Sequence, residues 1–198
     1  PWTGPSAVGL RTSVGLGDRL GLATPGHIQA VRETNLACVL AQQSIREMER
    51  TQRTARAVMD DATWGVFQEG WREGYGADAD HLKTEADIDY CASEGFTWYT
   101  FDPREHVDND AETDPVSVLR TKYAALPWER LNTTAAATRE RYVGKRWDLG
   151  GLALRMNEED LLRAACKYAR AVAHLAAMYR HLDHVMSGKP YEVEVSVD

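Results

Sequence analysis

The chain has 198 residues, 43% of them hydrophobic and 27% charged, which suits a folded domain with a sizeable core and argues against a mainly disordered chain. Acidic residues outnumber basic ones by 30 to 23, and the net charge of -7 gives no general attraction to nucleic acid or to an anionic membrane. Three widely separated cysteines do not indicate a disulfide framework, and no apolar run is long enough to cross a bilayer, so we expect a cytoplasmic protein.

The first 110 residues alternate between short apolar segments and helix-like segments. Each apolar segment ends in polar residues, and the first is followed by a helical pattern that Thr24 and Pro25 begin. This alternation predicts β–α units and a parallel sheet. The expected strands cover 13–16, 37–44, 76–84 and 96–102, and the further expected helices cover 55–71 and 86–93.

The second part of the chain, from about Asp114 to Ser187, shows only helical patterns. Its last segment, Glu158 to Val185, has apolar residues at the helical period and predicts one long helix. The final residues alternate polar and apolar side chains, as a strand does. We therefore expect residues 1–110 to begin a barrel, 111–188 to form a helical insertion or cap, and 189–198 to be the next barrel strand of a longer sequence.

Polar residues gather where the expected strands end. In parallel β–α architectures these ends meet at one edge of the sheet and form the ligand site. Carboxylates and imidazoles together suit a divalent metal such as zinc, manganese or nickel, and the remaining cations suit a substrate carboxylate. The four clusters are Asp18, Arg19 and His27; Gln42, Gln43, Ser44, Arg46 and Glu47; Asp78, Asp80, His81 and Lys83; and Asp102, His106 and Asp108.

Each cluster also has a structural interpretation. Asp18 and Arg19 would form an ordinary ion pair, and His27 would pack beside its helix. The glycines around Asp18 match neither dinucleotide-binding nor P-loop spacing, and Ser44 lacks the flanking glycines of a nucleophile elbow. His106 lies two residues before Asp108, which would place both side chains on one face of an extended segment.

Four runs in this order resemble the tagaturonate epimerase family: GDRLGLATPGHIQA, AQQSIREMERTQRT, GADADHLKT and GFTWYTFDPREHVD. The family consists of metal-dependent sugar-acid epimerases that interconvert tagaturonate and fructuronate. The fold that fits is α/β, a (β/α)8 (TIM) barrel-like structure that is incomplete in this chain and carries a helical insertion. Family members are longer, and their downstream HSGSDK-type motif is absent here, so part of the metal site is expected from outside these 198 residues.

The resemblance implies epimerisation at C4 of a 2-keto hexuronate. The C4 hydrogen is β to the ketone, so simple enolisation does not exchange it, whereas retro-aldol cleavage and re-addition would invert the centre. Two alternatives stay open: a non-catalytic sugar-acid binding protein, and a sugar isomerase or aldolase on the same barrel. We expect a small sugar-acid substrate, no nucleic acid or membrane partner, and assembly into a homo-oligomer.

We expect residues of the four clusters to supply the base, the metal ligand and the substrate contacts. Asp18 is the expected base, and His27 is its substitute in acid–base chemistry. His106 is the expected metal ligand, and His81 is its substitute. The residues expected to bind the substrate are Arg19, Gln43, Ser44, Arg46 and Lys83.

Overall fold

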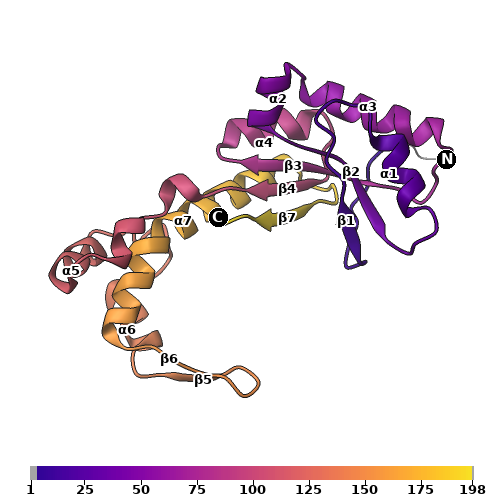
Figure 1. Cartoon of the computed structure of the whole chain (residues 1–198). Coiled ribbons are helices and arrows are strands. Elements are labelled where there is room, and N and C mark those ends of the chain that lie inside the picture. The colour runs from indigo at the N-terminus through magenta and orange to yellow at the C-terminus, as the bar shows by residue number, and fades with distance from the viewer. Residues whose placement is uncertain (1–3, 198) are drawn as a thin grey trace. The chain divides into compact units, whose positions relative to one another are not determined.

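A computed structural model describes residues 4–197 of the chain (Figure 1). Its main feature is a curled sheet of five strands in the order β1-β2-β3-β4-β7, in which every neighbouring pair is parallel. The parallel sheet predicted from the alternating pattern is therefore confirmed. The strands are β1 (Ser13–Gly15), β2 (Ala37–Ser44), β3 (Gly76–Leu82), β4 (Trp98–Phe101) and β7 (Glu192–Val195).

Four helices connect the first four strands. The helices are α1 (Thr24–Val31), α2 (Ile45–Thr51), α3 (Ala55–Gln68) and α4 (Glu85–Ser93). The first three pack against β2, and α4 packs against β3 (Figure 1). Pro25 lies in the first turn of α1, where its missing N–H costs no helical hydrogen bond. Apolar side chains cover the sheet on this side, including the fully buried Ile28, Leu40 and Ile88.

Pairing register brings polar side chains together on the other face of the sheet. Gln42 pairs with Asp78, which pairs with Trp98 on the next strand. The register shifts once in β2, between Val39 and Ala41, and such a shift changes which side chains face each way. As a result Gln42 and Asp78 lie on the same face of the sheet. The alternation of residues along each strand does not by itself predict this pairing.

The chain divides into two compact units. The first contains the five-stranded sheet and comprises residues 4–102 and 178–197, and the second is Pro103–Ala177. The long helix α7 (Glu158–Val185) has residues in both, and its bounds agree with the prediction from periodicity. The second unit also contains η1 (Arg104–His106), η2 (Asn109–Glu112), α5 (Val116–Ala124), α6 (Ala135–Tyr142), β5 (Arg146–Asp148) and β6 (Ala153–Arg155).

Two local predictions are wrong, and one helix was not predicted. The segment after Asp114 is not purely helical, because β5 and β6 form an antiparallel pair around Gly150 and Gly151. The helix that was not predicted is α2, which Ser44 caps. His106 and Asp108 do not lie on an extended segment, since His106 ends a 3-10 turn. Among residues 4–197, no helix combines the length and the apolar character needed to cross a membrane.

Candidate functional site

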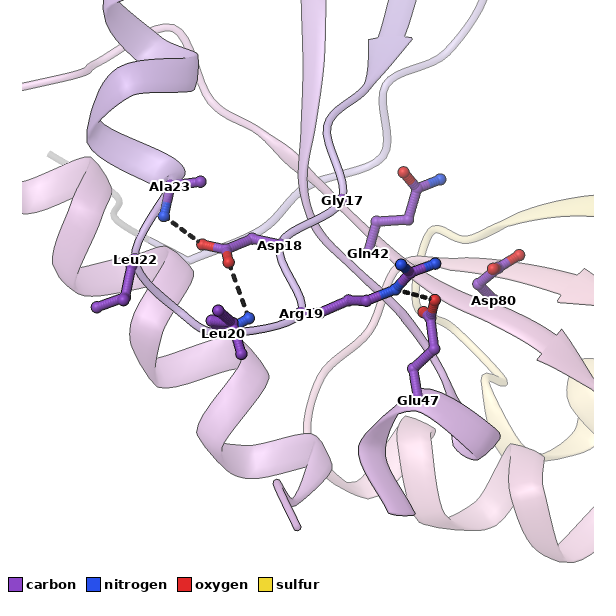
Figure 2. Close-up of a pocket in the computed structure, with 9 residues that line it drawn as sticks. All are labelled: Gly17, Asp18, Arg19, Leu20, Leu22, Ala23, Gln42, Glu47 and Asp80. Carbon is purple, nitrogen blue, oxygen red and sulfur yellow. Dashed lines mark hydrogen bonds and ion pairs between the residues drawn. The ribbon is translucent and has the colours of Figure 1, made fainter. Parts of the chain in front are cut away.

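A cavity of about 720 Å³ lies at the carboxyl edge of the sheet, beside the ends of β1, β2 and β3 (Figure 2). The loop after β1 forms one wall, and the end of β2, the start of α2 and the end of β3 contribute polar side chains. This is the edge at which β–α proteins bind ligands. The residues that line the cavity are Gly17, Asp18, Arg19, Leu20, Leu22, Ala23, Gln42, Glu47 and Asp80.

Asp18 orders the loop that forms this wall. Its Oδ1 accepts hydrogen bonds from the backbone N–H groups of Leu20 at 3.0 Å and Gly21 at 2.9 Å, and its Oδ2 accepts one from Ala23 at 2.6 Å (Figure 2). Burial raises the pKa of Asp18, but these bonds and the charge of Arg53 outweigh burial and hold the pKa below its ordinary value. A carboxylate held in this way is a weak base.

Arg19 and Glu47 form an ion pair inside the cavity. The Nε of Arg19 donates to Oε1 of Glu47, and the Arg19 side chain stays 72% exposed (Figure 2). Burial raises the pKa of Glu47, but its bonds to the Ser44 N–H and to Arg19 outweigh burial, so the pKa lies below its ordinary value. The Asp18–Arg19 ion pair, which the sequence left open, is not formed, because Arg19 pairs with Glu47.

Asp78 is a buried carboxyl group next to the cavity residue Gln42. Its Oδ2 accepts a 2.9 Å hydrogen bond from Nε2 of Gln42, and its Oδ1 accepts one of 2.9 Å from Oγ1 of Thr100. Burial, with smaller effects from the charges of Asp80 and Glu194, raises the pKa of Asp78 to about 6. Asp78 therefore changes protonation close to neutral pH, a property that the sequence clusters did not reveal.

Asp80 and His81 form a carboxylate–imidazole pair at the end of β3. Oδ1 of Asp80 lies 2.6 Å from Nδ1 of His81, and Asp80 lines the cavity. His81 has a φ of 55°, in the left-handed region that is strained for a histidine. Strained backbone of this kind is often kept where it positions a functional side chain.

The sequence did not single out Arg53, which fixes the cavity loop from behind. Its Nη1 donates to the carbonyl of Asp18 at 2.8 Å and to Oε1 of Gln43 at 2.7 Å, and its Nη2 donates to Oδ2 of Asp61 at 2.7 Å. The side chain is only 12% exposed. Arg53 thus joins the loop after β1 to β2 and α3. The acidic partners of a buried arginine have no fixed sequence spacing, so no local pattern marks this residue.

Three of the residues expected to bind substrate lie away from the cavity. Gln43 is fully buried and bonds to Arg53 and Thr51, because the neighbouring Gln42 takes the cavity face of β2. Ser44 caps α2 and accepts a hydrogen bond from the N–H of Glu47, whose side chain returns the contact. Arg46 is exposed on α2 and is not among the lining residues.

The remaining predicted residues are also placed elsewhere. Lys83 follows β3, and its N–H donates to Asp87 at 3.0 Å. His27 lies on α1 with its Nδ1 buried, and it does not line the cavity. His106 belongs to the second unit, where its ring stacks on His174 with the ring centres 4.0 Å apart. Burial, followed by the His174 charge, lowers the pKa of His106.

A divalent metal needs several histidine, cysteine or carboxylate side chains close together. Within residues 4–197 no three histidine, cysteine, aspartate or glutamate side chains converge closely enough to hold an ion. The Asp80–His81 pair offers two donors of suitable type. The donors described in this chain therefore do not by themselves make up a metal site.

The family comparison adds to this geometry. A family model described as UxaE, tagaturonate epimerase, matches residues 1–198. The chain belongs to the tagaturonate epimerase family. The first three of the four sequence runs that resembled this family carry the cavity residues Asp18, Arg19, Gln42, Glu47 and Asp80.

Relatives within the tagaturonate epimerase family agree with this assignment. The Tagaturonate/fructuronate epimerase of Thermotoga maritima is 44% identical over 194 residues, which are 98% of this chain and 38% of that protein. A glycerol-complexed crystal structure of the fructuronate-tagaturonate epimerase UxaE from Cohnella laeviribosi matches with a TM-score of 0.90 and 39% identity, over 99% of this chain and 39% of that one. Its native crystal structure gives a TM-score of 0.88 at the same identity, over 98% and 39%. The chain thus spans about two fifths of the length of these relatives.

Proposed function

We propose that this chain is part of an epimerase that interconverts tagaturonate and fructuronate at C4. The observation that carries the proposal is the cavity at the carboxyl edge of the sheet. Its lining places the guanidinium group of Arg19 among the carboxylates of Asp18, Glu47 and Asp80, and the chain belongs to the tagaturonate epimerase family. The substrates are sugar acids, and a guanidinium beside hydrogen-bonding oxygens suits a ligand with one carboxylate and several hydroxyl groups.

Arg19 is the proposed partner of the substrate carboxylate. Its side chain is largely exposed, and its bond to Glu47 uses only Nε, so within residues 4–197 its terminal nitrogens stay available to a ligand. Gln42 is the proposed partner of a substrate oxygen, because its side chain lines the cavity. The hydrogen bond from its Nε2 to Asp78 holds the amide group in place. Gln42 takes the role first assigned to Gln43.

Asp80 is the proposed base, in place of Asp18. It would take the proton of the C4 hydroxyl group, the C3–C4 bond would break to an aldehyde and an enediolate, and re-addition to the other aldehyde face would invert C4. Within residues 4–197 the carboxylate of Asp80 has one bond, to His81, whereas both oxygens of Asp18 accept backbone hydrogen bonds. After re-addition Asp80 would return the proton to the C4 alkoxide, and His81 would hold the Asp80 carboxylate in place.

Three finer points are proposals of the same kind. A divalent metal and a closed (β/α)8 barrel are expected for the whole enzyme, and elemental analysis of the purified protein would check the first. A cytoplasmic location is supported by Cys38, Cys91 and Cys166, which are buried and free of disulfides. No step of the reaction above depends on any of these points.

A chimera tests the function directly. These 198 residues would replace the matching 194 residues of the Thermotoga maritima epimerase, and nuclear magnetic resonance would follow the conversion of tagaturonate to fructuronate. We expect interconversion. A chimera that binds tagaturonate, with the folded structure verified by circular dichroism, but never forms fructuronate would favour a binding protein instead.

The same chimera tests the base. Asp80→Asn should lower turnover by about 10²-fold or more, because general base catalysis contributes that much, and should leave substrate affinity nearly unchanged. Asp60→Asn is the matched control, since Asp60 is an exposed residue of α3 that pairs with Arg56. Turnover of Asp80→Asn equal to that of the control would exclude Asp80 as the base.

A further inference from the structure

A second cavity, of about 510 Å³, lies where the strands of the sheet begin. Its walls contain Arg11, just before β1; Arg32, between α1 and β2; and Arg72, between α3 and β3. Three successive connections at the amino edge of the sheet thus each supply one arginine to the same space. The lining contains one carboxylate, that of Glu73.

The charge of this cavity is opposite to that of the chain as a whole. Thirty acidic residues against 23 basic ones give the chain a net charge of -7. The cavity at the carboxyl edge follows that excess, with Asp18, Glu47 and Asp80 against Arg19. The three arginines outnumber Glu73 in the lining and Glu69, which pairs with Arg32, so the local potential is positive and would attract an anion.

Stabilisation of helix ends accounts for only one of the three arginines. The helices end at this edge of the sheet, and a cation there bonds to the last carbonyl groups. Arg32 does so, since its Nη2 donates to the carbonyl of Glu69 at 2.9 Å and pairs with that side chain at 3.4 Å. Arg11 instead bonds through Nε to the carbonyl of Val8 at 3.0 Å, and among residues 4–197 its terminal nitrogens have no hydrogen-bond partner.

Arg72 has no structural role of this kind. Within residues 4–197 its side chain makes no hydrogen bond and no ion pair, although it lies on the cavity wall. An arginine that lines a cavity and bonds to nothing keeps its whole guanidinium fork for a ligand. Trp71, next to it, is 9% exposed and anchors the connection through a 2.8 Å bond from Nε1 to the carbonyl of Gly74.

We propose that this cavity binds the phosphate group of a small phosphorylated metabolite. Guanidinium groups bind phosphate oxygens in pairs, and arginines from separate loops surround such a group from several sides. The volume is in the range of small-molecule sites and exceeds the space that a phosphate ion alone would fill. The Asn35 side chain and the cavity wall near Leu36 would contact the rest of the molecule.

Isothermal titration calorimetry of the 198-residue chain tests the proposal at constant ionic strength. The probes are glucose 6-phosphate, inorganic phosphate and glucose. We expect saturable binding of glucose 6-phosphate, none of glucose, and about tenfold weaker binding by Arg72→Ala, because a charge-assisted hydrogen bond contributes that much. Arg50→Ala is the matched control, since Arg50 is an exposed residue of α2 outside this cavity, and it should bind as the wild type does.

The outcomes separate the possible sources of the phosphate. Tighter binding of glucose 6-phosphate than of inorganic phosphate supports a metabolite, and equal binding supports the same site for the free ion. Two results would overturn the proposal: no saturable binding of either phosphate compound, or equal loss in Arg72→Ala and Arg50→Ala. Loss in Arg19→Ala with retention in Arg72→Ala would move the phosphate to the other cavity and would also overturn it.

Discussion

Single carboxyl groups in this protein differ sharply in what their surroundings do to them. Asp18 accepts three backbone N–H bonds and has a lowered pKa, whereas the buried Asp78 accepts two side-chain bonds and has a pKa raised to about 6. Hydrogen bonds from fixed backbone donors favour the charged form, and burial disfavours it. The contributions of the two residues to the free energy of unfolding therefore change with pH in opposite directions.

Replacement of Asp18 should weaken the fold. Asp18→Asn keeps one acceptor oxygen where three N–H groups point, and we expect a loss of about 1–2 kcal/mol in the free energy of unfolding at neutral pH. Because the folded pKa of Asp18 is depressed, its contribution is present above the unfolded pKa and is lost as the pH falls through the folded pKa. Urea unfolding across this acidic range should show the difference between wild type and Asp18→Asn shrinking with acid. A difference that is constant with pH would contradict this.

Replacement of Asp78 should have the reverse pH dependence. Its folded pKa of about 6 lies above the unfolded value, so its contribution to stability is present below the unfolded pKa and is lost as the pH rises through 6. Asp78→Asn retains an acceptor for Thr100 and carries no charge to bury, so at about pH 7.5 it should be more stable than wild type by on the order of 2 kcal/mol. Urea unfolding at about pH 4.5 and about pH 7.5 measures this. Asp60→Asn, at an exposed position, should show no such change.

Packing between elements depends on one glycine of α3. A Cβ at Gly65 would lie 2.6 Å from Cβ and Cγ2 of Thr24, so α1 and α3 approach each other only because Gly65 has no side chain. Gly65→Ala should destabilise the fold by about 1–3 kcal/mol despite the better helix propensity of alanine. Gly26→Ala, in α1 with no atom within 4 Å of the new Cβ, is the control and should stabilise by about 0.5–1 kcal/mol. Thermal unfolding of both variants would test the pair, and equal effects would refute the close-packing argument.

Regular elements were largely predictable from sequence, because apolar periodicity reports burial directly. The bounds of β2 and α7 agree with the expected ones. The short α2 was missed although Ser44 and Glu47 have the spacing of a capping box, and the β5–β6 pair was missed because its residues are mostly exposed and carry no apolar alternation.

Cavity residues were less predictable than strands, and β2 shows why. Strict alternation identifies two faces, but the register shift between Val39 and Ala41 changes which face each later residue takes. The sequence therefore led to Gln43 as the substrate contact, whereas Gln42 is the residue that lines the cavity. Arg53 and Asp78 depend on contacts with residues distant in sequence, which no local pattern encodes.

For the molecule as a whole, the outer strands of the sheet are the exposed feature. β7 pairs only with β4 among residues 4–197, and Val195 and Val197 are 45% and 52% exposed. An open strand edge with apolar side chains pairs readily with another chain. We expect the apparent mass to rise with protein concentration in sedimentation velocity, and Val195→Lys to reduce this rise. Leu149→Lys, at an exposed site in the second unit, should leave it unchanged. Equal behaviour of the two variants would assign the association to another surface.

The bonds of Arg53 also make the cavity wall depend on elements outside the cavity. Arg53 follows α2 and joins the Asp18 carbonyl to Gln43 of β2 and to Asp61 of α3. The loop after β1 is therefore tied through one side chain to the packing of β2 and α3. A substitution that loosens α3, although it lies outside the cavity, would also disturb the wall that a ligand contacts.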